Sequence, residues 1–214
     1  MSNKETVSEM NQSKWYTVIK RVYETLLAIA GLIILSPLLL VVCIAIKIED
    51  PKGAIFFKQI RVGKEEREFE IFKFRTMRND AEEKLAELLQ YNEIEGAMFK
   101  MKDDPRITKV GKFLRKTSID ELPQLLNVVK GNMALVGPRP PLPREVENYT
   151  ERDKKRLVVI PGCTGLWQVS GRNELDFYQM VELDLQYIKE ASLLFDFKIM
   201  VKTVGVMVAP KNAY

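Results

Sequence analysis

The chain has 214 residues with a formal net charge of +4, and it contains two cysteines but no histidine. The lack of histidine excludes catalytic triads and metal sites that depend on an imidazole, and two cysteines cannot form a zinc site. Cys43 lies in an apolar run and Cys163 in a glycine-flanked loop, so we expect both thiols to be free. The mild positive excess suits an anionic partner such as a phosphate, a lipid headgroup or a nucleic acid.

Residues 1–19 form a largely polar N-terminal extension that we expect to be flexible. The next segment, 20–48, is predicted to be a membrane helix, because its residues 25–46 carry no charge and could cross a bilayer core of about 30 Å. Ser36-Pro37 interrupts the middle of this helix. Proline removes one backbone hydrogen bond and kinks the helix, and the serine hydroxyl can partly satisfy the freed group.

Basic residues flank both ends of the apolar segment, so the positive-inside rule draws both ends to the same side of the membrane. A re-entrant hairpin broken at Pro37, which enters and leaves by one face, accounts for both the proline and the balanced charges. A kinked helix that spans the membrane is the alternative, since proline is common in such helices.

Residues 49–214 are predicted to form one cytoplasmic α+β domain that is mainly helical. Residues 54–62 and 68–77 are rich in Ile, Val and Phe with partial alternation, which predicts a β-hairpin or small sheet. Helices are expected at 79–91, 145–156 and 175–190. The final segment, 193–208, is amphipathic and either lies in the membrane interface or packs on the domain.

Two adjacent carboxylates, Asp120 and Glu121, open an apolar run. Ser118 and Glu121 have capping-box spacing, Pro123 is tolerated in a first helical turn, and Gly131 ends the helix. The acids are therefore placed at a helix N-terminus, which favours an ionised carboxylate and attracts phosphate. Taken alone, this motif would more often be a simple helix cap.

Three further segments carry candidate binding residues. In Gly137–Pro141, prolines fix the backbone around Arg139 and could aim it at phosphate or carboxylate, although a stiff surface loop is equally compatible. In residues 161–173, Trp167 and Arg172 could contact a base and a phosphate, or form part of an ordinary strand and turn. The cations of the predicted hairpin could equally belong to a solvated strand face.

Taken in order, these segments resemble the bacterial sugar transferase family, the monotopic phosphoglycosyl transferases. Each motif is short, but the ordered set is specific and covers about residues 20–208. The matching motifs are Lys20-Arg21, Ser36-Pro37, Phe72–Met77, Asp104–Thr108, Thr117–Gln124, Gly137–Pro140 and Pro161–Asn173. Cys163 departs from the aliphatic residue expected at its position, and we expect this difference to be neutral.

The resemblance implies a transfer of sugar phosphate from a nucleotide diphosphosugar to a polyprenol phosphate, with Mg²⁺ as cofactor and UMP as product. Asp120 would be the nucleophile and Glu121 a magnesium ligand. The phosphate contacts would come from Lys73, Arg75, Arg106 and Arg139. This chemistry suits the composition, because a diphosphate needs cations and a hard metal, a carboxylate can carry the phosphoryl group, and no histidine is needed.

The implied partners are a UDP-sugar, with a hexose such as glucose or galactose expected, and undecaprenyl phosphate. The implied location is the cytoplasmic face of the bacterial cytoplasmic membrane, where the enzyme would initiate surface glycan or exopolysaccharide assembly. A membrane-anchored glycosyltransferase that releases UDP and a non-catalytic membrane scaffold are the alternatives. Nucleic acid is not an expected partner, because the basic residues are scattered and no nucleic-acid motif is present.

Overall fold

The computed structural model describes residues 13–78, 80, 81, 83, 84, 88, 101, 104–171 and 175–208. The predicted flexible extension and the predicted helix at 79–91 fall mostly outside these residues, as does Arg172. The described chain is mainly helical, with two small two-stranded sheets, so the predicted α+β class is confirmed. Both cysteines are free, as expected.

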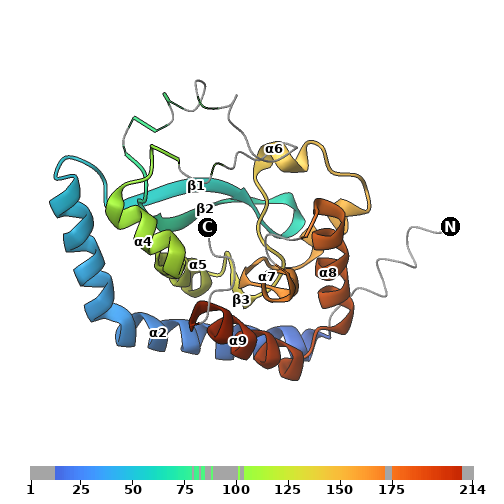
Figure 1. Ribbon diagram of the computed structural model, residues 1–214. Helices are drawn as coiled ribbons and strands as arrows, with labels where there is room; N and C mark the ends of the chain where they lie inside the picture. The colour runs from blue at the N-terminus through green and yellow to red at the C-terminus, as the bar shows by residue number, and fades with distance from the viewer. Residues whose placement is uncertain are drawn as a thin grey trace.

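The longest element is α2, Lys14–Glu49, which contains Pro37. Within the described residues, it is the one helix long and apolar enough to cross a membrane. It continues through Pro37 and changes direction along its length (Figure 1), so the predicted break is a bend within one helix. The Ser36 hydroxyl donates a 2.7 Å hydrogen bond to the Ile33 carbonyl. This carbonyl is the one that Pro37, lacking an N–H, cannot bond, so the predicted compensation by serine is confirmed.

Both halves of α2 pack on the rest of the protein. Ala28, in the first half, is fully buried in a cluster that includes Val128. Val42 and Ile46, in the second half, are buried in another cluster that includes Phe74. The helix therefore lies along the domain instead of projecting away from it (Figure 1).

The predicted β-hairpin is confirmed. Strand β1, Phe56–Val62, pairs antiparallel with β2, Glu68–Phe74, and the short 3₁₀ helix η1, Lys64–Glu66, lies in the turn. Asn127, which is fully buried, fixes the hairpin to the helix beneath it. Its side chain accepts from the Phe72 amide at 3.0 Å and donates to the Glu70 carbonyl at 2.6 Å, so it satisfies part of the free edge of β2.

The second sheet is a parallel pair that the sequence analysis did not predict. Strand β3, Ala134–Val136, pairs with β4, Gly162–Thr164. Side by side, Gly137 and Gly162 leave no room for side chains, because a Cβ on Gly162 would lie 2.1 Å from the Gly137 nitrogen. This close approach brings the loop after β3, which contains Arg139, next to the segment that begins with β4.

The C-terminal third is helical. The predicted helix at 145–156 is two shorter elements, α6 (Pro143–Val146) and the 3₁₀ helix η4 (Asp153–Val158), because the Asp153 carboxylate accepts from the Thr150 amide and hydroxyl and starts a new turn. Then follow α7 (Leu166–Ser170), α8 (Phe177–Glu190) and α9 (Leu193–Val208). Helix α8 was predicted, and α9 is the segment predicted to be amphipathic.

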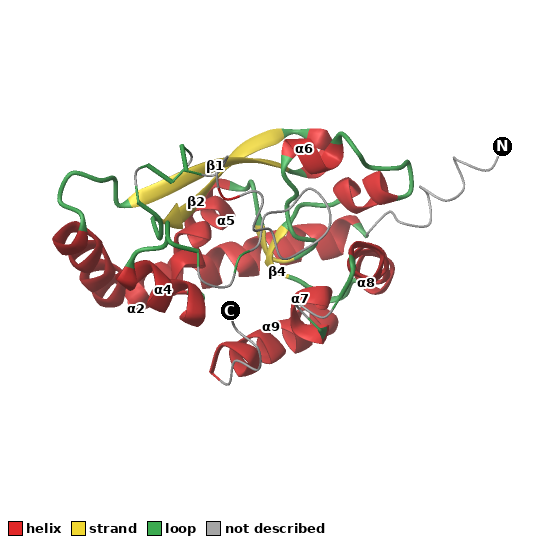
Figure 2. Ribbon diagram, turned by 45° about the horizontal axis from the view of Figure 1, so that its top comes forward, coloured by secondary structure: helices red, strands yellow, loops and turns green. Residues whose placement is uncertain are grey.

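The elements lie in layers. The β-hairpin lies on one side, and α2 and α9 lie on the other (Figures 1 and 2). Between them sits a buried cluster formed by Val136, Leu166, Tyr187, Ile188 and Ile199. The helices α2 and α9 therefore share one face of the molecule.

Candidate functional site

The two adjacent acids lie on a short helical connection. Helix α4, Lys109–Thr117, ends at Ser118, which has the left-handed φ of 57°. The 3₁₀ helix η3, Ile119–Gln124, and α5, Leu125–Lys130, follow, and Gly131 with φ of 92° ends α5 as predicted. Asp120 and Glu121 therefore lie in a first helical turn, as predicted, although that turn is 3₁₀ instead of α.

The predicted capping box between Ser118 and Glu121 does not form. The Ser118 side chain makes no capping hydrogen bond, because this residue has the left-handed backbone of a helix C-cap instead of the extended backbone of an N-cap. The Glu121 carboxylate instead contacts Lys73 on β2, with 2.6 Å between Oε1 and Nζ. Glu121 therefore does not cap the helix, and its carboxylate is paired with Lys73 instead.

The two acids differ in their electrostatic environment. Burial, together with the neighbouring Glu121 carboxylate, raises the pKa of Asp120 to about 6, although Lys73 and Arg115 oppose the shift. Burial also raises the pKa of Glu121, but Lys73 and then Arg139 outweigh it, so that this pKa lies below its usual range. The predicted effect of the helix terminus on Asp120 is thus overcome by desolvation. At pH 7, above this pKa, Asp120 would still be mainly ionised.

A pocket of about 630 Å³ opens beside these acids. One part of its wall is charged and includes Asp120, Glu121 and Arg139. The other part is mainly apolar and includes Leu125 from α5 and Val204 from α9. The pocket therefore combines groups suited to a phosphate with a surface suited to a hydrocarbon chain.

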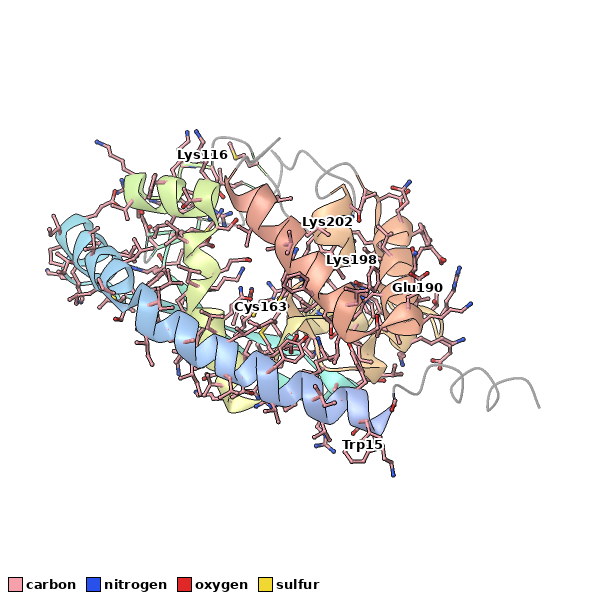
Figure 3. The ribbon with its side chains drawn as sticks, turned by 90° about the horizontal axis from the view of Figure 1, so that it is seen from below. Trp15, Lys116, Cys163, Glu190, Lys198 and Lys202 are labelled. Atoms are coloured by element: carbon pink, nitrogen blue, oxygen red, sulfur yellow. The ribbon has the colours of Figure 1, made fainter. Side chains whose placement is uncertain are left out.

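The apolar wall belongs to the face that carries α2 and α9. Seen from below, Cys163, which lines the pocket, is visible between α2 and α9, whereas Lys198 and Lys202 lie on the far side of α9 from it (Figure 3). Asp196 and Ile199 of α9 are buried against the domain. The opposite surface of α9 is apolar and more than half exposed at Leu194, Phe197, Val201 and Val204.

The structure brings Arg139 to the acids, as predicted. A second hollow, of about 20 Å³, lies next to the pocket and is lined by Glu121, Arg139, Lys73 and Arg61. The loop that carries Arg139 is bonded to β4, because the Pro138 carbonyl accepts a hydrogen bond from the Gly162 amide at 2.8 Å. Three cations thus surround the single carboxylate of this hollow, so positive charge predominates beside the pocket.

Two of the predicted phosphate-binding residues lie elsewhere. Arg75 pairs with Asp50, with 2.7 Å between Nη1 and Oδ2. Arg106 forms a bidentate pair with Asp104, and both side chains are buried. Neither arginine is among the residues that line the pocket, and each has a carboxylate partner.

Trp167 does line the pocket, as expected for a binding residue. Its ring is buried, and its indole nitrogen has no hydrogen-bond partner among the residues that the structure describes. Arg172, its predicted companion, lies outside the described residues.

The sequence analysis missed two arginines of the site. Arg115, at the end of α4, lines the pocket and donates to the Thr76 hydroxyl at 2.9 Å. Arg61, on β1, is buried and donates to the Pro140 carbonyl at 3.1 Å, directly after Arg139. Arg115 could have been found from its position five residues before Asp120. No feature of the neighbouring sequence distinguishes Arg61 from the other cations of the strand.

A magnesium ion fits this donor set only in part. Among the described residues, no three His, Cys, Asp or Glu side chains are grouped closely enough to hold a metal ion. However, Mg²⁺ commonly binds through one or two carboxylates together with substrate phosphates and water. Glu121, which lines the pocket, would supply one carboxylate, and the substrate phosphates and water would supply the remaining ligands.

The family of the chain is shown by its similarity to known proteins. Residues 15–210 match the profile of the family described as bacterial sugar transferase, a range that includes nearly all of α2, the acid pair and the Arg139 loop. The chain belongs to the bacterial sugar transferase family.

Several curated relatives match over nearly the whole chain. The galactosyl transferase CpsE of Streptococcus agalactiae is 48% identical over 199 residues, which cover 92% of this chain and 44% of that protein. The undecaprenyl-phosphate galactose phosphotransferase of Salmonella typhimurium is 44% identical over 92% of this chain and 42% of its own length. The chain therefore spans less than half of these two relatives. In contrast, the exopolysaccharide production protein ExoY of Sinorhizobium fredii, at 41% identity, is covered over 88% of its length.

Proposed function

We propose that this protein transfers a sugar 1-phosphate from a UDP-sugar to a polyprenol phosphate, with release of UMP and a covalent intermediate on Asp120. The observation that carries the proposal is the composition of the pocket. A buried carboxylate lies among cations on one side, and an apolar wall continues to the exposed apolar surface of α9 on the other. A lipid phosphate and a nucleotide sugar together would use both surfaces.

The first step is nucleophilic attack on the phosphorus attached to the sugar. A carboxylate oxygen of Asp120 forms the new bond, and the bond from this phosphorus to the bridging oxygen breaks, so that UMP departs with the bridging oxygen and its electron pair. Arg139 and Lys73 lie where they can neutralise charge on the phosphates. The pKa of about 6 leaves Asp120 ionised and nucleophilic near neutral pH.

The second step returns Asp120 to its starting state. An oxygen of the polyprenol phosphate attacks the same phosphorus, and the bond to Asp120 breaks. The product is a polyprenol diphosphosugar, whose hydrocarbon chain would follow the apolar wall formed by Leu125 and Val204. Mg²⁺, held partly by Glu121 when bound, would supply further neutralisation of phosphate charge.

The names of the relatives support a hexose substrate. Two of the relatives described above carry galactose or galactosyl in their names, and another relative, from Komagataeibacter xylinus, is named an undecaprenyl-phosphate glucose phosphotransferase. We therefore propose UDP-galactose or UDP-glucose as the donor and undecaprenyl phosphate as the acceptor, in the initiation of an exopolysaccharide or other surface glycan.

The proposed topology is a re-entrant α2 with the catalytic domain, residues 49–214, on the cytoplasmic face. Ala28 and Ile46, from the two halves of α2, are both buried against the same domain, which a straight spanning helix would not allow. The exposed apolar surface of α9 would lie in the same membrane interface.

Product analysis tests this proposal against its alternatives. Purified protein in lipid nanodiscs is incubated with Mg²⁺, undecaprenyl phosphate and a panel of UDP-sugars, and the released nucleotide is identified by chromatography. The proposal predicts UMP together with a lipid diphosphosugar, whereas a glycosyltransferase moving sugar alone would release UDP. Release of neither nucleotide with any sugar would support the scaffold alternative.

A further inference from the structure

Glu24 is a buried carboxylate at the start of the uncharged part of α2. Its side chain is 2% exposed, and a carboxylate in such a place is retained only where it has specific partners. Oε1 accepts from Lys20 Nζ at 2.5 Å and from the Val136 amide at 3.1 Å. Lys20 in turn reaches Asp196 of α9 at 2.9 Å.

The bond to Val136 lies at an edge of β3 that no described strand covers. Val136 is the last residue of β3, whose one strand neighbour is β4. The next amide, that of Gly137, bonds to the Thr164 carbonyl of β4. The Val136 amide itself bonds to Glu24 instead of to β4, so Glu24 takes the place that a third strand would have. Tyr187 approaches the Val136 carbonyl at the same edge, at 3.1 Å.

Val136 is three residues before Arg139, and the chain between them has little freedom. Pro138 and Pro140 fix two of the backbone angles on either side of Arg139. The Pro138 carbonyl is bonded to Gly162, and the Pro140 carbonyl is bonded to Arg61. A displacement of Val136 would therefore pass along this stiff segment to the guanidinium instead of being absorbed by the loop.

We propose that Glu24 is a positioning residue for Arg139, through which the membrane helix sets the affinity of the site for the nucleotide diphosphosugar. The inference rests on the proposed function, in which Arg139 contacts the substrate phosphates. Glu24 touches no substrate in this scheme. It fixes the end of β3 relative to α2, and β3 fixes the arginine.

Three variants separate positioning from other roles. Glu24→Leu removes the acceptor for the Val136 amide, whereas Glu24→Gln keeps an acceptor oxygen at the same reach. Thr25→Val is the matched control, because the Thr25 hydroxyl bonds to the Arg21 carbonyl of its own helix. KM and kcat for the UDP-sugar, and the inhibition constant of UMP, are measured on monodisperse protein in nanodiscs.

The expected result for Glu24→Leu is a roughly 10- to 100-fold lower kcat/KM, carried mainly by KM and accompanied by weaker UMP inhibition. Glu24→Gln and Thr25→Val should resemble the wild type. If the Leu variant does not fold, Glu24→Asp gives the same test, because it keeps the charge beside Lys20 but withdraws it from Val136 by one methylene group. Normal KM and normal UMP inhibition in folded Glu24→Leu or Glu24→Asp protein would overturn the inference.

A double-mutant cycle with Arg139→Ala tests whether Glu24 acts through Arg139. If Glu24 acts through Arg139, Glu24→Leu should cause little further loss when Arg139 is already absent. Losses that multiply in the double variant would show that Glu24 acts elsewhere. Failure of the proposed function has a different signature, because wild-type protein would then release no UMP from any UDP-sugar.

Discussion

The Nζ atom of Lys73 lies 2.6 Å from Oε1 of Glu121, and this contact joins the β-hairpin to the helical turn that carries the acid pair. The two residues lie 48 residues apart in the sequence. The hairpin therefore contributes a side chain directly to the candidate site. The contact holds Glu121 ionised next to Asp120, and the ionised Glu121 in turn raises the pKa of Asp120. The Lys73–Glu121 contact therefore moves the pKa values of the two adjacent acids apart, with Glu121 below and Asp120 above its usual range.

Removing the cation should disable the site. We predict that Lys73→Met lowers the rate of UMP release by roughly 100-fold or more, because phosphate charge loses a positioned cation and Glu121 loses its partner. Lys58→Met is the matched control, since Lys58 lies on the other strand of the hairpin and pairs with Glu70 in an exposed contact of 3.1 Å. Equal rates for the two variants would contradict the assignment of Lys73 to the site.

Asp120 should make the folded protein less stable as the pH rises. Its pKa is raised to about 6 in the folded state, so between its ordinary value and pH 6 the folded state binds more protons than the unfolded state and stability falls with increasing pH. Asp120→Asn removes this effect. We predict a gain in the free energy of unfolding of about 1–3 kcal/mol at pH 7 and little gain at pH 4.

Thermal unfolding of metal-free protein in detergent, at both pH values, measures this difference. Glu182→Gln is a suitable control, because Glu182 pairs with Arg152 on the surface. An Asp120→Asn variant that is less stable than the wild type at pH 7 would contradict the assigned cause of the pKa shift.

Much of the local structure could be predicted from the sequence. The hairpin, the helices α8 and α9, and the stop at Gly131 follow from periodicity and from turn residues, which act over a few neighbouring positions. The parallel pair β3–β4 was missed, because three-residue strands have no detectable period and the glycines that allow their approach, Gly137 and Gly162, lie far apart in the chain.

The composition of the candidate site was predicted less completely. Asp120, Glu121 and Arg139 could be identified from their motifs, and the pocket brings them together. Arg75 and Arg106 occur in equally distinctive motifs, yet each pairs with a carboxylate away from the pocket. Whether a cation faces a substrate or an acid depends on contacts between elements that lie apart in the sequence. Arg75 and Asp50, for example, are 25 residues apart. Local sequence patterns carry no information about such contacts.

The bend at Pro37 should decide the topology of α2. We predict that cysteines placed at Ser2 and Ala213, in a chain whose Cys43 and Cys163 are replaced by serine, are both labelled only from the cytoplasmic side. Pro37→Ala restores the missing backbone hydrogen bond, so some molecules should adopt a spanning α2 and expose Ser2 to the periplasm. Ser36→Ala, which removes only the hydroxyl contact to Ile33, is the milder control. Periplasmic labelling of Ser2 in the otherwise unchanged chain would show that α2 spans the membrane.

The exposed apolar surface of α9 should contribute to membrane binding. We predict that Phe197→Glu together with Val201→Glu increases the fraction of protein extracted from membranes by carbonate, because both side chains are more than half exposed on this surface. Tyr178→Glu is the control, since Tyr178 is 74% exposed near the start of α8, away from α9 (Figure 1). Unchanged extraction of the double variant would place this face of α9 outside the membrane interface.

The central claim is that Asp120 carries the sugar phosphate, and mass spectrometry of the quenched enzyme tests it most directly. Enzyme, Mg²⁺ and UDP-hexose are mixed without lipid, quenched and digested, with Asp120→Asn treated in parallel. We predict UMP stoichiometric with enzyme and a hexose-phosphate adduct on Asp120, both absent from the variant. Near-normal turnover by Asp120→Asn, or UMP release that requires the lipid acceptor and leaves no adduct, would contradict the account.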